Sequence, residues 1–355
     1  MIKLPTMPGI TTQQVATSRL LQHVRLSGPE SGEPVIFIHG NVSSGTFWEE
    51  TMLALPEGFR GIAPDLRGYG ESEFKPVDAT RGLGDFADDV LALADALGCD
   101  RFHVVGHSMG GSVAFQVLAT APERLQTITL AAPGSPYGFG GTKDLDGTPC
   151  WPDFAGSGGG LVSPEFAGLL AVQDRGIDNP RASPRLVMNS FYWKVPFRPA
   201  REEELLSSMF TIRVKEDHYP GDMVKSANWP GVGPGVIGPN NALSPKYVGD
   251  MVERILAADH KPPILWIHGA DDQIVSDMSF FDLGTLGKIQ AVPDWPGEEA
   301  FPPQPMKGQT RRVLQRYIEA GGYFHEIELA DCGHSPYLEK PKAFNNAFHA
   351  LLHKK

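Results

Sequence analysis

A serine flanked by glycines, in the run Gly106-His107-Ser108-Met109-Gly110, is the clearest chemical signal in this sequence. The apolar residues 102–105 before it predict a strand, and residues 110–120 after it predict a helix. Glycines on both sides permit a sharp strand-to-helix turn, because a side chain there would collide with neighbouring backbone. Such a turn leaves the hydroxyl of Ser108 free, so we interpret Ser108 as a nucleophile.

A serine nucleophile needs a base to take its proton and an acid to orient that base. His334 follows a glycine in the turn after the last predicted strand and is the candidate base. Asp272, in the loop after strand 263–267, is the candidate acid, with the adjacent Asp271 as the alternative. Because the carboxyl ends of parallel strands meet at one edge of a sheet, we expect Ser108, Asp272 and His334 to converge there.

Charge that develops on a carbonyl oxygen during acyl transfer must be stabilised by hydrogen-bond donors. We expect two backbone N–H groups in this role. One belongs to Met109, directly after the serine, and the other to Asn41, in the loop after His39-Gly40. No group of residues has the spacing of metal ligands, so we expect neither a metal nor a cofactor.

The elements that must position these residues alternate along the chain. Short apolar runs predict core strands at 34–38, 61–65, 102–105, 125–130, 263–267 and 324–329. Helical spacing predicts helices at 85–97, 110–120, 245–258, 308–320 and 341–353. Strands that alternate with helices indicate an α/β fold with a doubly wound, mostly parallel sheet.

The alternation stops in the middle of the chain. We predict a catalytic core formed by residues 1–133 and 245–355, with residues 134–244, rich in glycine, proline and aromatics, inserted as a cap. Residues 276–307 form an accessory loop within the core, without regular structure of its own. Trp193 of the cap and Trp295 of this loop are the candidate pocket residues.

Composition narrows the choice of partners. The net charge of -11, from 31 basic and 42 acidic side chains, disfavours nucleic acid and anionic membranes as partners. No apolar stretch has the length of a membrane span, and the N-terminus lacks the pattern of a secretory signal. Three sparse cysteines fit a reducing compartment, so we expect a cytoplasmic protein. We also expect a monomer or homodimer that acts on a small molecule.

With these motifs in place, the chain resembles the α/β-hydrolase superfamily, in its capped, esterase-like branch. The matching segments are His39-Gly40-Asn41, Asp65 to Ser72, Gly106 to Gly111, Gly269 to Asp272, and Gly333-His334. They cover residues 33–133 and 255–355 well and the cap poorly. The spacing typical of the family, three residues after the glycine of His-Gly, selects Asp272 over Asp271. The interval from Asp272 to His334 is longer than is usual for the family.

The resemblance implies a serine hydrolase that cleaves a carboxylic ester or lactone through an acyl-enzyme. Relatives that attack carbon with an aspartate are disfavoured, because the nucleophile position here is Ser108. Three alternatives stay open. The same residues suit carbon–carbon bond hydrolysis of the meta-cleavage-product type and suit an amidase or peptidase. The third alternative, of another class, is a non-catalytic ligand-binding relative.

Overall fold

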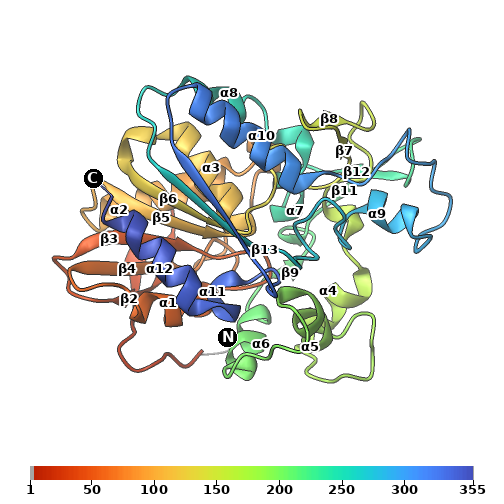
Figure 1. Cartoon of the computed structure of the whole chain (residues 1–355). Coiled ribbons are helices and arrows are strands. Elements are labelled where there is room, and N and C mark those ends of the chain that lie inside the picture. Colours follow the sequence, from red (N-terminus) through yellow and green to blue (C-terminus); the bar gives the residue numbers. More distant parts are fainter. Residues whose placement is uncertain (1–3, 355) are drawn as a thin grey trace.

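An eight-stranded sheet forms the centre of the molecule in the computed structural model, which describes residues 4–354 (Figure 1). The strand order is β1-β2-β4-β3-β5-β6-β13-β14. The strands are β1 (Thr11–Ala16), β2 (Leu21–Ser27), β3 (Glu33–Ile38), β4 (Phe59–Pro64), β5 (Phe102–His107), β6 (Leu125–Ala131), β13 (Ile264–Gly269) and β14 (Phe324–Leu329). Each predicted core strand is confirmed to within two residues.

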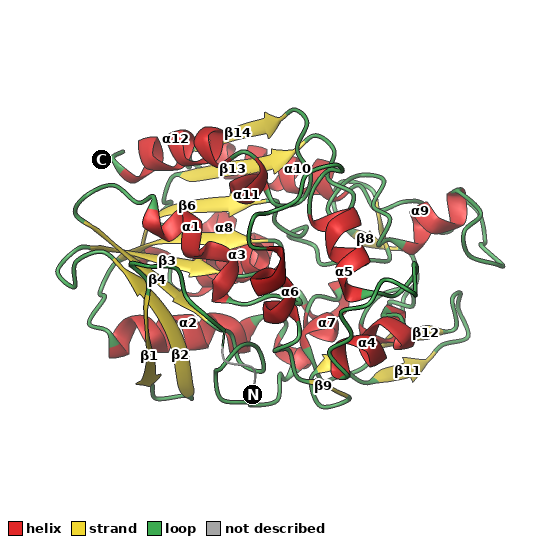
Figure 2. Cartoon of the chain, turned by 90° about the horizontal axis from the view of Figure 1, so that it is seen from below, coloured by secondary structure: helices red, strands yellow, loops and turns green. Residues whose placement is uncertain are grey.

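The sheet is parallel from β4 through to β14, whereas β1 pairs with β2, and β2 with β4, in antiparallel fashion. Helices cover both faces, as Figures 1 and 2 show. One layer holds α2 (Gly84–Ala96), α3 (Met109–Thr120), α8 (Met251–Ala257) and α10 (Met306–Glu319). The other holds α1 (Glu49–Leu53), α11 (Pro336–Glu339) and α12 (Pro341–Leu352). The predicted doubly wound, mostly parallel α/β fold is therefore confirmed.

Burial on both faces explains why the central strands read as continuous apolar runs. Every residue of β5 and β13 is buried, and so are residues 35–38 of β3. A strand that lies between two helical layers has no solvent face, so it shows no polar alternation. The outermost strand β14 has no fully buried residue, because it lies at the edge of the sheet.

The chain between β6 and α8 contributes no strand to the central sheet. It forms short helices and three two-stranded ladders on the side of the molecule where the parallel strands end (Figure 2). Its elements are β7 (Thr142–Lys143), β8 (Thr148–Pro149), α4 (Pro164–Ala171), α5 (Pro184–Val187), a π-helical turn (Met188–Tyr192), α6 (Glu202–Met209), β9 (Val214–Lys215), β10 (Tyr219–Pro220), β11 (Met223–Lys225), β12 (Val232–Pro234) and α7 (Pro239–Ala242).

Two predictions about regular structure were wrong in part. The helix predicted over 245–258 begins only at Met251, because Gly249 has a φ of +60° and separates α8 from a preceding 3-10 turn. The accessory loop 276–307 does contain regular structure, namely α9 (Leu283–Lys288). The Asp282 side chain caps α9 by accepting a hydrogen bond from the Thr285 N–H. Within residues 4–354, no helix is long and apolar enough to cross a membrane.

Candidate active site

Ser108 occupies the turn between β5 and α3 in a strained backbone conformation. Its φ is +54° and its ψ is -120°, values that non-glycine residues rarely adopt. The turn is held by the Ser108 N–H, which donates to the Ala131 carbonyl of β6 at 3.0 Å. A Cβ on Gly106 would lie 2.3 Å from the Gly110 carbonyl oxygen, and one on Gly110 would lie 2.2 Å from that of Ile38. The glycines therefore permit the close approach that this turn requires.

The structure brings Asp272 and His334 together in a buried pair. The Asp272 Oδ2 atom lies 2.8 Å from Nδ1 of His334, and the two residues are 4% and 2% exposed. The other carboxylate oxygen accepts hydrogen bonds from the N–H groups of Ile274 and Val275, at 2.8 and 3.0 Å. These donors fix the carboxylate, so Oδ2 is directed at the imidazole. The neighbouring Asp271 instead pairs with Lys194 near the surface.

His107 links this pair to the serine turn. Its ring centroid lies 4.7 Å from that of His334, and its Nε2 donates a hydrogen bond to the His334 carbonyl at 2.9 Å. Burial, together with the His334 ring, lowers the pKa of His107 well below its usual value, so the ring is neutral. Within residues 4–354, the Ser108 hydroxyl makes no hydrogen bond to His334. Catalytic hydrogen bonds are often long until substrate binds.

The loop after β3 packs directly against the serine turn. A Cβ on Gly40 would lie 3.1 Å from the Ser108 Cβ. Over the part of the chain that the structure describes, the N–H groups of Asn41 and Met109 find no acceptor. An N–H without an internal acceptor is available to an oxyanion. The geometry of the two loops is therefore compatible with the predicted pair of donors.

Two tyrosines that sequence reasoning missed hold the Asn41 loop. The Tyr69 hydroxyl donates to Oδ1 of Asn41 at 2.7 Å, and the Tyr192 hydroxyl donates to the Val42 carbonyl at 3.2 Å. Val42 has a φ of +48°, so these bonds support a strained turn. Tyr69 lies within the matched segment 65–72, which is the signal that could have drawn attention to it. Tyr192 lies in the π-helical turn of the cap and had no such signal.

A buried ionic cluster around Asp65 contacts the loop that follows β3. Asp65 accepts hydrogen bonds from Arg25, from the N–H of Gly45 and from the ring of His23. Burial opposes ionisation of Asp65, but the Arg25 guanidinium and the His23 ring hold its pKa below the usual range. Burial also lowers the pKa of His39 to about 4, so this neutral ring accepts the N–H of Leu66 through Nε2.

The two predicted pocket tryptophans lie in different surroundings. Trp193 is 1% exposed and lies against the histidine loop, since a Cβ on Gly333 would come within 2.9 Å of the Trp193 Cα. Trp295 is half-buried and packs on Gly287 of α9, with its indole N–H bound to the Phe301 carbonyl at 2.9 Å. Trp193 is thus near the candidate site, whereas the contacts of Trp295 lie within the accessory segment.

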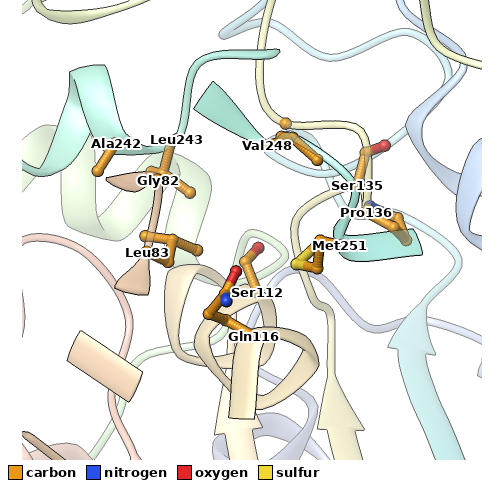
Figure 3. Close-up of a pocket in the computed structure, with 11 residues that line it drawn as sticks. Gly82, Leu83, Ser112, Gln116, Ser135, Pro136, Ala242, Leu243, Val248 and Met251 are labelled. Atoms are coloured by element: carbon orange, nitrogen blue, oxygen red, sulfur yellow. The ribbon is translucent and has the colours of Figure 1, made fainter. Parts of the chain in front are cut away.

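A separate apolar pocket lies along α3, one helical turn beyond Ser108 (Figure 3). It is lined by Gly82, Leu83, Ser112, Gln116, Ser135, Pro136, Gly138, Ala242, Leu243, Val248 and Met251. None of the three candidate catalytic residues contributes to its walls. In residues 4–354, no group of three or more His, Cys, Asp or Glu side chains is arranged to hold a metal ion.

Comparison with known proteins finds one matching family over part of the chain. The model of the alpha/beta hydrolase fold family matches residues 33–156. "Putative carbamate hydrolase RutD" of Variovorax paradoxus is 38% identical over 109 residues, which are 30% of this chain and 41% of that protein. "Epoxide hydrolase 2" of Siraitia grosvenorii is 32% identical over 123 residues, or 34% and 38% of the two chains. The matches thus span about two fifths of these relatives.

Solved structures resemble nearly the whole chain. A serine hydrolase from Cycloclasticus zankles superposes with a TM-score of 0.61 at 18% identity, over 97% of this chain and 98% of the other. Carboxylesterase CesB of Bacillus subtilis gives 0.58 at 16% identity, over 97% and 92%. At such low identity the likeness bears on the fold alone. The chain therefore has the α/β-hydrolase fold, and its residues 33–156 match the model of the alpha/beta hydrolase fold family.

Proposed function

We propose that this protein is a serine hydrolase that cleaves a carboxylic ester or lactone. The observation that carries the proposal is the buried Asp272–His334 pair, 2.8 Å apart, beside a serine with a φ of +54° at the strand-to-helix turn. In the proposed reaction, Ser108 attacks the ester carbonyl and His334 takes its proton. Asp272 keeps the Nδ1 atom of His334 protonated, so that Nε2 is the acceptor.

Proposed stabilisation of the tetrahedral intermediate comes from the N–H groups of Asn41 and Met109. As the intermediate collapses, His334 returns the proton to the departing alcohol, and the acyl group stays on Ser108. Water, activated by His334, then attacks the acyl-enzyme and releases the acid. Besides water, the proposed steps use Ser108, Asp272, His334 and the two N–H donors, and the Asp272–His334 and His107–His334 contacts support this scheme.

The names of relatives leave the leaving group open. The similar proteins include a carbamate hydrolase, epoxide hydrolases and a 2-hydroxy-6-oxo-6-phenylhexa-2,4-dienoate hydrolase. A serine at the nucleophile position favours attack on a carbonyl over attack on an epoxide carbon. Carbon–carbon and amide cleavage use the same chemistry at Ser108, and both are outcomes of the test below.

The test is hydrolysis of p-nitrophenyl acetate, butyrate and octanoate by the wild type, by Ser108→Ala and by Ser112→Ala. Ser112 is the matched control, because it is a buried serine one helical turn along α3. We expect turnover in the wild type and in Ser112→Ala, and none above background in Ser108→Ala. A carbamate, a proline anilide and the phenylhexadienoate named above, assayed in parallel, separate the alternatives. If a fluorophosphonate does not label the folded wild type, the proposal is wrong.

A further inference from the structure

A single carboxylate connects the histidine loop to the cap. Glu339, the last residue of α11, accepts the Gly333 N–H at 2.8 Å on one oxygen and the Ser335 N–H at 3.2 Å on the other. These donors lie immediately before and after His334. Hydrogen bonds to a charged acceptor are stronger than neutral ones, so Glu339 fixes the backbone on both sides of the imidazole.

The third donor to Glu339 comes from the cap. The backbone N–H of Lys194 reaches the same carboxylate at 2.8 Å. A Cβ on Gly333 would lie 2.6 Å from the Lys194 nitrogen, so the cap backbone rests directly on the histidine loop. Burial raises the pKa of Glu339, whereas the three N–H donors favour its charged form. No fourth backbone donor to this carboxylate occurs in residues 4–354.

The side chain of Lys194 makes a second connection. Its Nζ atom lies 2.9 Å from a carboxylate oxygen of Asp271 and 2.8 Å from one of Asp331. Asp271 directly precedes the candidate acid, and Asp331 is on the loop of the candidate base. The pairs are near the surface, and such pairs contribute little energy singly. Their value here is geometric, because one ammonium group bridges the two loops.

We propose that Glu339 and Lys194 are positioning residues that connect the cap to the loops of Asp272 and His334. These contacts hold His334, the proposed base, in a fixed position relative to the cap. The inference rests on the proposed function, since it assigns these residues a role in the reactivity of Ser108. Neither residue touches the reacting atoms in this scheme. A shift of the cap would instead displace His334 through the shared carboxylate.

The experiment compares Glu339→Gln and Lys194→Met with the wild type. A glutamine offers one acceptor oxygen to three donors and turns an NH2 group toward them, so at least one bond is lost. Glu319→Gln is the matched control, because Glu319 is likewise the last residue of a helix but is exposed. Three quantities are measured: the rate of Ser108 labelling by a fluorophosphonate, the thermal midpoint, and hydrogen exchange of peptides covering 188–197 and 331–339.

We expect Glu339→Gln to slow labelling roughly ten- to a hundredfold, as for a base displaced by a fraction of an ångström. Exchange rises in both peptides. Lys194→Met slows labelling about two- to fivefold with little change in thermal midpoint. Lys194→Arg restores the rate, and Glu319→Gln behaves as the wild type. If Glu339 and Lys194 only stabilised the fold, the thermal midpoint and the labelling rate would fall together in their variants.

Several results would overturn the inference. Labelling of Glu339→Gln at the wild-type rate removes the positioning role, and faster exchange in 331–339 alone removes the coupling to the cap. If Glu339→Gln does not fold, an unchanged labelling rate in Lys194→Met is decisive against it. A wild type that is not labelled at all refutes the proposed function instead. In that case, the exchange data still show whether the cap and the loop are coupled.

Discussion

Asp272→Asn should nearly abolish activity while leaving the fold intact. In the wild type, Oδ1 of Asp272 accepts the N–H groups of Ile274 and Val275, and Oδ2 faces Nδ1 of His334. The asparagine can keep the two backbone bonds only by placing its oxygen at the Oδ1 position. Its NH2 group must then face Nδ1 of His334. The imidazole responds by accepting at Nδ1 and carrying its proton on Nε2.

That tautomer cannot take the proton of Ser108. In serine proteases, the same change costs about 10⁴-fold in kcat, which corresponds to roughly 5.5 kcal/mol of transition-state stabilisation. We expect a loss of this order in kcat/KM for p-nitrophenyl butyrate. The thermal midpoint should change by only a few degrees, because the two backbone N–H groups keep their acceptor.

Asp271→Asn provides the comparison, because it alters the adjacent carboxyl that pairs with Lys194 and not with His334. Its expected loss is less than about fivefold, since a surface ion pair is worth roughly 1 kcal/mol or less. The reasoning is refuted if Asp272→Asn retains more than a tenth of the wild-type kcat/KM. It is also refuted if Asp271→Asn is the more damaging change.

Three further predictions concern the cap, the accessory segment and the serine turn. Tyr192→Phe removes the hydroxyl that donates to Val42, so kcat/KM should fall about fivefold, for a bond worth roughly 1 kcal/mol. Burial raises the pKa of Asp282 from 3.8 to about 6. The free energy of unfolding should therefore fall by roughly 3 kcal/mol as pH rises from about 4 to 6. Urea titrations of Asp282→Asn should show a weaker dependence of this free energy on pH. Gly110→Ala would bring a Cβ to 2.2 Å from the Ile38 carbonyl oxygen, so the yield of soluble protein should collapse.

Each of the three has a clear contrary result. An unchanged kcat/KM in Tyr192→Phe would mean that the Asn41 loop needs no support from the Tyr192 hydroxyl. The sign for Asp282 follows because the folded state binds its proton more tightly than the unfolded state, so the stabilisation is complete below pH 4 and lost by about pH 6. Equal slopes in the two titrations would contradict it. Normal soluble yield of Gly110→Ala would show that the turn can relax.

Local sequence patterns were sufficient to predict the core strands and to place Ser108 and Asp272 just after two of them. The runs before Ser108 and Asp272 are apolar because both strands are buried, and this signal is contained within a few adjacent residues. The stop before Met251 was missed, since Gly249 interrupts an otherwise helical pattern. The short helix α9 was missed for a related reason, because its six residues are too few to establish a period.

Contacts between the cap and the core could not be predicted from the sequence. Tyr192 reaches Val42 from 150 positions away, and Glu339 reaches Lys194 from 145 positions away. Both depend on how the cap is seated on the core, which no local periodicity encodes. Asp271 and Asp272 were separated by family spacing alone, whereas in the structure two backbone donors fix the orientation of Asp272. Roles for the catalytic and pocket residues stay predictions until the variants above are measured.

Because β13 lies beside β6, the edge of β6 has no neighbouring strand until late in the synthesis of the chain. The ribosome completes β6 at Ala131, but its sheet neighbour begins only at Ile264. While residues 132–263 are being synthesised, the nascent domain carries an open, apolar strand edge. Such edges invite pairing with other chains. Early release would therefore yield an aggregation-prone fragment that holds the serine without its partners, and slow translation should make the protein depend on chaperones.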